Sequence, residues 1–153
     1  MKYISTRGKS GSVEFSAVVL AGLAPDGGLY VPETIPDVRR ELSAWKDLSY
    51  RELAARIIRL FGDLPAPDVE RIVGRSYGAF SVPEVVRVAE VGNLHILELF
   101  HGPTLSFKDV ALQFLGNLFE HLLDKTGGEL NILAATSGDT GSAAINAVRG
   151  KKR

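Results

Sequence analysis

The stretch LHILELFHGPTLSFKDVALQFLG, residues 94–116, decides the fold. It begins with a short apolar run typical of a strand, 94–100, passes through a Gly-Pro turn, and continues as an apolar helical pattern. A second apolar run, 130–136, and another helical pattern from Ala143 follow. Two short apolar strands joined by a helix predict a right-handed parallel β-α-β-α unit over residues 94–149, in an α/β fold.

The residues before this unit predict a smaller, mainly helical part with short strands. The segment LAPDGGLYVPETIP, 23–36, carries too many prolines and glycines for a continuous helix. In LSYRELAARIIRLFG, 48–62, Ser49 and Glu52 have capping-box spacing and Gly62 is the expected stop. A second amphipathic helix is expected in APDVERIVGRSYGAF, whereas the SVPEVVRVAEVGN that follows has an ambiguous pattern.

We place the boundary between the two parts near Gly92 and Asn93, which gives an N-terminal domain, 1–92, and a second domain, 93–153. Each part is short, but 153 residues with 45% hydrophobic content suffice for a core.

Charge and composition exclude several classes of function. Lysine plus arginine equals aspartate plus glutamate at 18 each, so no overall field favours nucleic acid or an anionic membrane. Cysteine is absent, which excludes a disulfide framework and thiolate metal sites and agrees with a reducing compartment. The apolar run FSAVVLAGLA is far shorter than the ~20 residues that span a bilayer. We therefore expect a soluble, cytoplasmic protein.

The first loop expected to carry chemistry is HGPTLSFKD, at the carboxyl end of the first parallel strand, where open α/β folds bind ligands. Ser106 and Asp109 have capping-box spacing, which puts Lys108 in the first helical turn. The positive helix end, together with burial against Phe107 and the helix's apolar face, is expected to disfavour the charged form of this lysine. A partly neutral lysine attacks carbonyls. Alternatively, Lys108 extends to solvent or pairs with Asp109.

The second loop is TSGDTGS, 136–142, after the second apolar run. A strand-to-helix turn of this composition presents backbone amides and a helix N-terminus to an anion. It has neither the lysine of a P-loop nor the glycine spacing of a dinucleotide site, so a carboxylate is the expected anion. A plain tight connection between strand and helix is the alternative. On adjacent strand ends, the two loops would face one crevice and suggest lysine imine chemistry on an amino acid.

With LAPDGGLYVPE upstream, the motifs HGPTLSFKD and ATSGDTGSAA resemble threonine synthases, pyridoxal-phosphate enzymes of the tryptophan-synthase-β-like group. The resemblance covers nearly the whole chain. It implies that the chain is the N-terminal part of a fold-type-II enzyme. In that family the lysine of the Phe-Lys-Asp motif forms the Schiff base with pyridoxal 5′-phosphate.

The resemblance also assigns the candidate site residues of this chain. Lys108 inherits the catalytic role and binds the cofactor together with Phe107 and Asp139. The α-carboxylate of the amino-acid substrate would be held by the remaining residues of the turn, namely Thr136, Ser137, Gly138, Thr140 and Gly141. Related enzymes often carry asparagine at the position of Asp139, and a carboxylate there would hold a shared proton differently from an amide. No metal is implied.

The implied activity is that of a carbon-oxygen lyase, which converts O-phospho-L-homoserine and water to L-threonine and phosphate. Family members run to several hundred residues. Their loop that binds the cofactor phosphate, and the polar residue that contacts the cofactor's pyridine nitrogen, lie beyond the position that corresponds to Arg153. We therefore expect a fragment with weak cofactor binding and no turnover by itself. Two alternatives stay open: a non-catalytic chain that acts by binding, and a related dehydratase or β-replacement lyase.

The three histidines show no spacing typical of metal ligands. We expect structural or solvent-exposed roles for His95 and His121. For His101, which precedes the Gly-Pro turn, contact with the substrate phosphate is as good an interpretation as a structural role.

Overall fold

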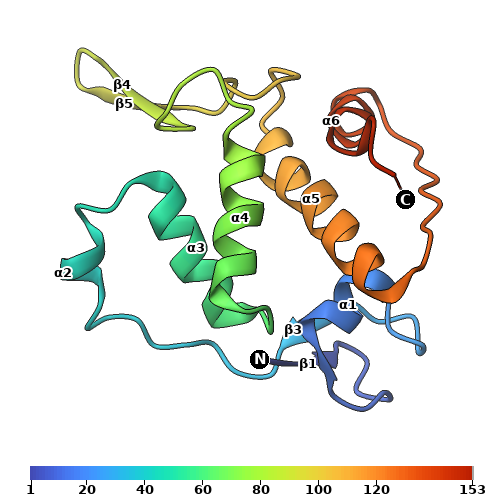
Figure 1. Ribbon diagram of the computed structural model, residues 1–153. Coiled ribbons are helices and arrows are strands. Elements are labelled where there is room, and N and C mark those ends of the chain that lie inside the picture. The colour runs from blue at the N-terminus through green and yellow to red at the C-terminus, as the bar shows by residue number, and fades with distance from the viewer. Residues whose placement is uncertain (153) are drawn as a thin grey trace. The chain divides into compact units, whose positions relative to one another are not determined.

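The computed structural model describes residues 1–152, which form two compact units, 1–70 and 71 onward. Figure 1 labels their helices and strands. The helix α4, Ala66–Tyr77, contains the boundary between the units. Within the described residues no helix is both long and apolar enough to cross a bilayer.

The first unit is built on a small antiparallel sheet. Its central strand β1, Lys2–Ser5, pairs with β2, Val13–Glu14, and with β3, Tyr30–Pro32. Helix α1, Phe15–Ala21, follows β2 directly. The Tyr3 ring lies 6.0 Å from that of Phe15, and its hydroxyl donates to the Phe61 carbonyl at 3.0 Å.

Asp26 holds the proline- and glycine-rich segment in place. Its carboxylate accepts hydrogen bonds from the Ser5 hydroxyl at 2.6 Å and from the amides of Gly28 and Lys9 at 2.9 and 3.0 Å. The turn ends at Gly27, whose φ of +76° favours glycine. The segment is therefore an ordered loop that leads into β3, as its composition predicts.

The two predicted amphipathic helices are confirmed. Helix α3, Tyr50–Phe61, follows the one-turn helix α2, Leu42–Trp45. Ser49 accepts from the Glu52 amide while the Glu52 carboxylate accepts from the Ser49 amide at 2.8 Å, so the capping box forms, and Gly62 ends the helix. The apolar face of α3 lines an open groove of about 450 Å³ with residues from 35–46.

The second unit contains α4, a β-hairpin and two packed helices. The hairpin joins β4, Arg87–Val91, to β5, Leu94–Glu98. The long helix α5, Asp109–Thr126, packs against α6, Asp139–Val148. The core of this unit is formed by Ile72, Val73, Val85, Leu118, Leu122 and Ala143.

The α/β class is confirmed, but the predicted parallel β-α-β-α unit is wrong for this structure. β5 pairs antiparallel with β4, in a register that sets Leu94 opposite Val91. Gly92, with φ of +63°, and Asn93 form the two-residue turn, a connection that antiparallel strands accept and parallel strands cannot use. An apolar run alone does not distinguish these two kinds of pairing.

The second predicted strand, 130–136, has no strand partner among the described residues. A parallel strand needs neighbouring strands and helices over both sheet faces. Here Leu133 is instead fully exposed and Ile132 half exposed. The domain boundary near Gly92 stays a prediction, and in this structure that position is the hairpin turn.

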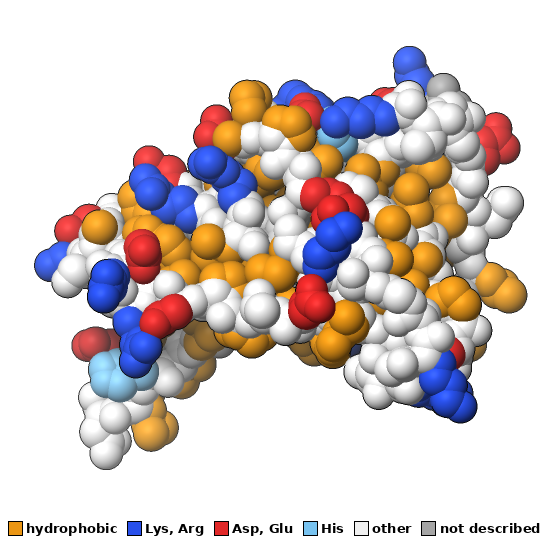
Figure 2. Space-filling model, turned by 90° about the horizontal axis from the view of Figure 1, so that it is seen from below, with side chains coloured by type: hydrophobic (Ala, Val, Ile, Leu, Met, Phe, Trp, Pro, Cys, Tyr) orange, Lys and Arg blue, Asp and Glu red, His pale blue; other side chains and the backbone are white. Residues whose placement is uncertain are grey.

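Large apolar side chains are exposed in both units. They include Ile35 and Leu42 in the first unit and Val88, Leu94 and Leu97 on the hairpin. Figure 2 shows such side chains among scattered lysine, arginine, aspartate and glutamate on one face.

Candidate functional site

Lys108 lies at the N-cap of α5, immediately before the first helical residue. Its backbone already has helical angles because residues 106–109 form a turn, in which the Asp109 amide donates to the Ser106 carbonyl at 3.0 Å. The Ser106 hydroxyl accepts from the Lys108 amide at 3.2 Å. Lys108 is thus at a helix start, but as the N-cap residue and not inside the first helical turn, where the sequence predicted it.

The predicted capping box between Ser106 and Asp109 is wrong. The Asp109 carboxylate is fully buried and accepts from the amide and the hydroxyl of Thr104, at 2.8 and 2.9 Å. Its other oxygen accepts from Gln113 at 3.3 Å. A side chain at Gly102 would overlap that of Asp109, so glycine lets the loop wrap around the carboxylate.

The Lys108 amine is left available for chemistry. Because the Asp109 oxygens are engaged within the loop, the alternative Lys108–Asp109 ion pair does not form. The amine is half-buried and lies 4.5 Å from the centre of the Phe107 ring, which is itself exposed. Over residues 1–152 no carboxylate lies within ion-pair distance of it. A lysine amine in this setting fits covalent attachment to an aldehyde.

The turn 136–141 is organised by the Thr136 hydroxyl. Its oxygen accepts from the amides of Gly138 and Gly141 at 3.2 and 3.1 Å. Gly138 has φ of +140°, a region that favours glycine. A side-chain carbon at Gly141 would lie 2.7 Å from the Thr136 oxygen. Both glycines are therefore required by the geometry of the turn.

This turn leaves donors pointing out of the N-terminus of α6. The amides of Asp139 and Thr140 have no acceptor among the described residues. The Thr136 hydroxyl still has its own proton to donate, because its hydrogen bonds to the amides use only the oxygen lone pairs. Ser137 and Asp139 are exposed and Thr140 is partly exposed. The arrangement fits a carboxylate of a small ligand.

The two predicted site segments are linked through their helices. Gly116 of α5 approaches Ala147 of α6 so closely that a side-chain carbon at Gly116 would lie 2.5 Å from the Ala147 carbonyl oxygen. One turn earlier, Gln113 donates to the Asn146 side chain at 3.1 Å. In the described residues no hydrogen bond or ion pair joins Lys108 to the turn itself, and the polar link that the structure shows runs through α5 and α6.

Sequence reasoning missed the polar residues on the buried face of α5. It predicted that the side of α5 beside Lys108 is an apolar face that includes Ala111. In the structure Ala111 is exposed. The buried residues include Asp109, Gln113 and Asn117 besides Leu118. The signal that could have found them is the spacing of four between successive polar residues.

The histidines are paired within the structure. His101 contacts the Glu98 carboxylate at 2.8 Å, and its ring lies 4.7 Å from that of Phe100. His121 contacts Arg71 at 2.9 Å, and His95 lies 3.6 Å from Glu90. These contacts favour the structural role of His101 over contact with a substrate phosphate.

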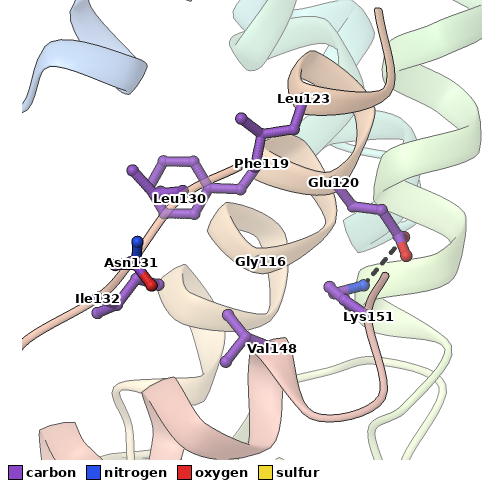
Figure 3. A pocket seen from close by; sticks show the side chains of 9 residues that line it. All are labelled: Gly116, Phe119, Glu120, Leu123, Leu130, Asn131, Ile132, Val148 and Lys151. Carbon is purple, nitrogen blue, oxygen red and sulfur yellow. Dashed lines mark hydrogen bonds and ion pairs between the residues drawn. The ribbon is translucent and has the colours of Figure 1, made fainter. Parts of the chain in front are cut away.

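A separate pocket of about 230 Å³ lies beside the helix pair. Figure 3 shows its lining from α5, from the segment 130–132 and from the end of α6, with Lys151 and Glu120 joined at 3.2 Å. None of the predicted site residues lines it.

Comparison with known proteins identifies the family. The family described as threonine synthase N terminus matches residues 2–77. Threonine synthase from Pseudomonas aeruginosa is 50% identical over 153 residues, which cover 97% of this chain and 33% of that protein. Threonine synthase from Schizosaccharomyces pombe is 47% identical, with 99% and 32% covered.

Solved structures agree. The pyridoxal-phosphate-bound threonine synthase from Brucella melitensis matches with a TM-score of 0.93 at 45% identity, over 99% of this chain and 33% of that one. The yeast enzyme matches with a TM-score of 0.91 at 45% identity, with the same coverage. The chain thus spans about a third of the length of the relatives it matches. It belongs to the threonine synthase family and corresponds to the N-terminal portion of those enzymes.

Proposed function

We propose that this chain supplies the catalytic lysine and the substrate-carboxylate turn of a pyridoxal-phosphate enzyme that converts O-phospho-L-homoserine and water to L-threonine and phosphate. The observation that carries the proposal is the Lys108 amine, without a carboxylate partner among the described residues and fixed at the start of a helix tied to α6. The likeness to threonine synthases, one of them bound to pyridoxal phosphate, supports it.

The residues present fit the cofactor by the chemistry of their donors. Lys108 would hold the cofactor covalently, and Phe107, exposed beside the amine, would lie against it. Asp139, exposed at the first residue of α6, is assigned to the cofactor's 3′-oxygen. When bound, pyridoxal phosphate supplies an electron sink for the substrate's carbanionic charge.

The chain's own residues would position the substrate and move protons. The amides of Asp139 and Thr140, together with the Thr136 hydroxyl, would hold the substrate α-carboxylate beside Ser137, Gly138 and Gly141. With its amine free, Lys108 would take the proton from the substrate's Cα and would then transfer a proton at Cβ, so that the γ-phosphate can leave before water adds. Because no carboxylate among residues 1–152 lies within ion-pair distance of this amine, it is free for both roles.

The compartment and partners follow from composition. We place the protein in the cytoplasm, since the absence of cysteine agrees with a reducing compartment. Its partner would be a small amino-acid substrate rather than nucleic acid or a membrane, because its charges balance.

The test is covalent trapping. The 153-residue chain is mixed with pyridoxal 5′-phosphate, reduced with borohydride and digested, and the pyridoxyl group is quantified on Lys108 relative to the exposed Lys46. We expect preferential labelling of Lys108, weak binding overall, and loss of that label in Lys108→Arg. Equal labelling of the two lysines would refute the assignment.

Activity separates the reaction classes. In an enzyme of family length that contains these residues, Lys108→Ala is expected to abolish threonine formation. With O-phospho-L-homoserine as substrate, threonine and phosphate in equal amounts support the proposed reaction. Conversion of serine or threonine to a keto acid, without any threonine formation, would indicate the dehydratase alternative. The absence of both Lys108 labelling and turnover would favour the non-catalytic alternative.

A further inference from the structure

Helix α5 carries a row of buried polar side chains at a spacing of four residues. They are Asp109, Gln113, Asn117 and His121, and none is more than 8% exposed. Residues four apart lie on one face of a helix, so the four form a continuous line, which we call the α5 polar ladder.

Each member of the ladder contacts a different part of the second unit. Asp109 holds the loop through Thr104, and Gln113 donates to Asn146 of α6. Asn117 donates to Ser76 of α4 at 3.0 Å and accepts from Lys151, just after α6, at 2.9 Å. His121 contacts Arg71 of α4.

Two of these contacts bracket the place where α5 and α6 touch. Gln113 bonds to Asn146, Asn117 bonds to Lys151, and Gly116 meets Ala147 between them. The Lys151 amine also bonds to Glu120 at 3.2 Å, as the dashed line in Figure 3 shows. A slip of α6 by one helical turn, about 5.4 Å, would break both hydrogen bonds at once.

Apolar side chains in place of the α5 polar ladder could fill the same space without needing hydrogen-bond partners at fixed positions. A buried polar group needs a partner at hydrogen-bond distance, and one left without it costs free energy. Buried polar residues are known to fix the register of packed helices for this reason. The ladder is thus suited to setting the position of α6 along α5, beyond simply burying surface.

We propose that Gln113 and Asn146 are positioning residues, which fix the turn 136–141 at the start of α6 relative to Lys108 at the start of α5. This inference rests on the proposed function for its catalytic meaning, while the register itself can be measured without the cofactor. Neither residue touches the reacting groups.

The test uses the 153-residue chain and three variants of α6. Asn146→Ala removes one of the two acceptors of Gln113, the other being Asp109, and so removes the hydrogen bond that links Gln113 to α6. Asn146→Asp keeps an acceptor, and Ile145→Ala removes a neighbouring exposed side chain as a control. Hydrogen exchange is measured at the amides of Gly141 and Ser142, and borohydride trapping gives the Lys108-to-Lys46 labelling ratio.

We expect Asn146→Ala to speed exchange and to lower the labelling ratio by about two- to tenfold, the range expected for one hydrogen bond. Asn146→Asp should restore both measurements and Ile145→Ala should change neither. Unchanged exchange in Asn146→Ala, an equal effect of Ile145→Ala, or no rescue by Asn146→Asp would overturn the ladder inference. If the starting chain shows no preference for Lys108, the proposed function fails, and the exchange data still decide whether the ladder sets the register.

Discussion

Asp109 shows how a single residue prepares Lys108. Its buried carboxylate accepts three hydrogen bonds, two of them from Thr104. We expect Asp109→Asn to lower the free energy of unfolding by about 1–3 kcal/mol, because the new amide places a donor opposite another donor. Urea unfolding of the 153-residue chain measures this.

Asp139→Asn is the matched control, since the same substitution falls on an exposed side chain at the start of α6. Its free energy of unfolding should stay close to that of the unsubstituted chain. If the two substitutions cost the same, the Asp109 hydrogen bonds do not contribute as the structure indicates.

At the scale of elements, the same sequence spacing has two outcomes. Ser49 and Glu52 form the predicted capping box, with Ser49 in an extended conformation before the helix. Ser106 and Asp109 do not, because Lys108 already has helical angles and the shorter carboxylate turns to Thr104. The helices could thus be predicted from periodicity, whereas the cap of α5 depended on a loop partner that local spacing does not reveal.

For the candidate site, too, the sequence indicates the local features but not the contact that joins them. Lys108 stands out in sequence as a cation at a helix start, and the turn 136–141 as a cluster of glycines and hydroxyls. The link between them through Gln113 and Asn146 joins residues 33 positions apart. Its side chains carry no local signal of pairing, so only the packing of α5 on α6 reveals it.

Glu120 on α5 makes the free energy of unfolding depend on pH through its contacts with Lys151 and Arg75. Burial raises the pKa of its carboxyl, but the hydrogen bonds and charges of Lys151 and Arg75 outweigh this and lower the pKa below its ordinary value. The folded protein therefore binds the proton more weakly than the unfolded chain does. The resulting stabilisation is present above the ordinary carboxyl pKa, about 4.3, and is lost as the pH falls through the lower folded value.

We therefore expect acidification from about pH 6 to pH 3 to reduce the free energy of unfolding less in Glu120→Gln than in the unsubstituted chain. Urea unfolding across this range measures the difference. Glu129→Gln, at an exposed carboxylate just after α5, serves as the charge-matched control and should follow the unsubstituted chain. Parallel pH curves for Glu120→Gln and the unsubstituted chain would contradict the prediction.

At the scale of the whole molecule, the sequence pattern and the packing disagree about where apolar residues lie. The runs 94–100 and 130–136 predict strands buried in one parallel sheet. In the structure, residues of the first run form an exposed hairpin with β4, and the second run pairs with no described strand. Apolar periodicity reports which residues favour burial, but it does not specify the neighbours that would bury them. In this chain the core of the second unit comes from α4, α5 and α6 instead.

A pair of identical substitutions tests this distribution. Leu118 is 1% exposed, whereas Leu133 is fully exposed in the extended segment. Leu118→Ala should lower the free energy of unfolding by about 2–5 kcal/mol, because it leaves a cavity in the core. Leu133→Ala should change it by no more than about 0.5 kcal/mol, since the side chain has no packing to lose. Urea unfolding at two protein concentrations measures both values and reveals any association between chains.

If Leu118→Ala does not fold, Leu118→Val gives a milder loss of about 1 kcal/mol at the same position. A loss at Leu133 as large as the loss at Leu118 would mean that the segment 130–136 is buried in solution. The exposure of this segment in the structure would then be wrong.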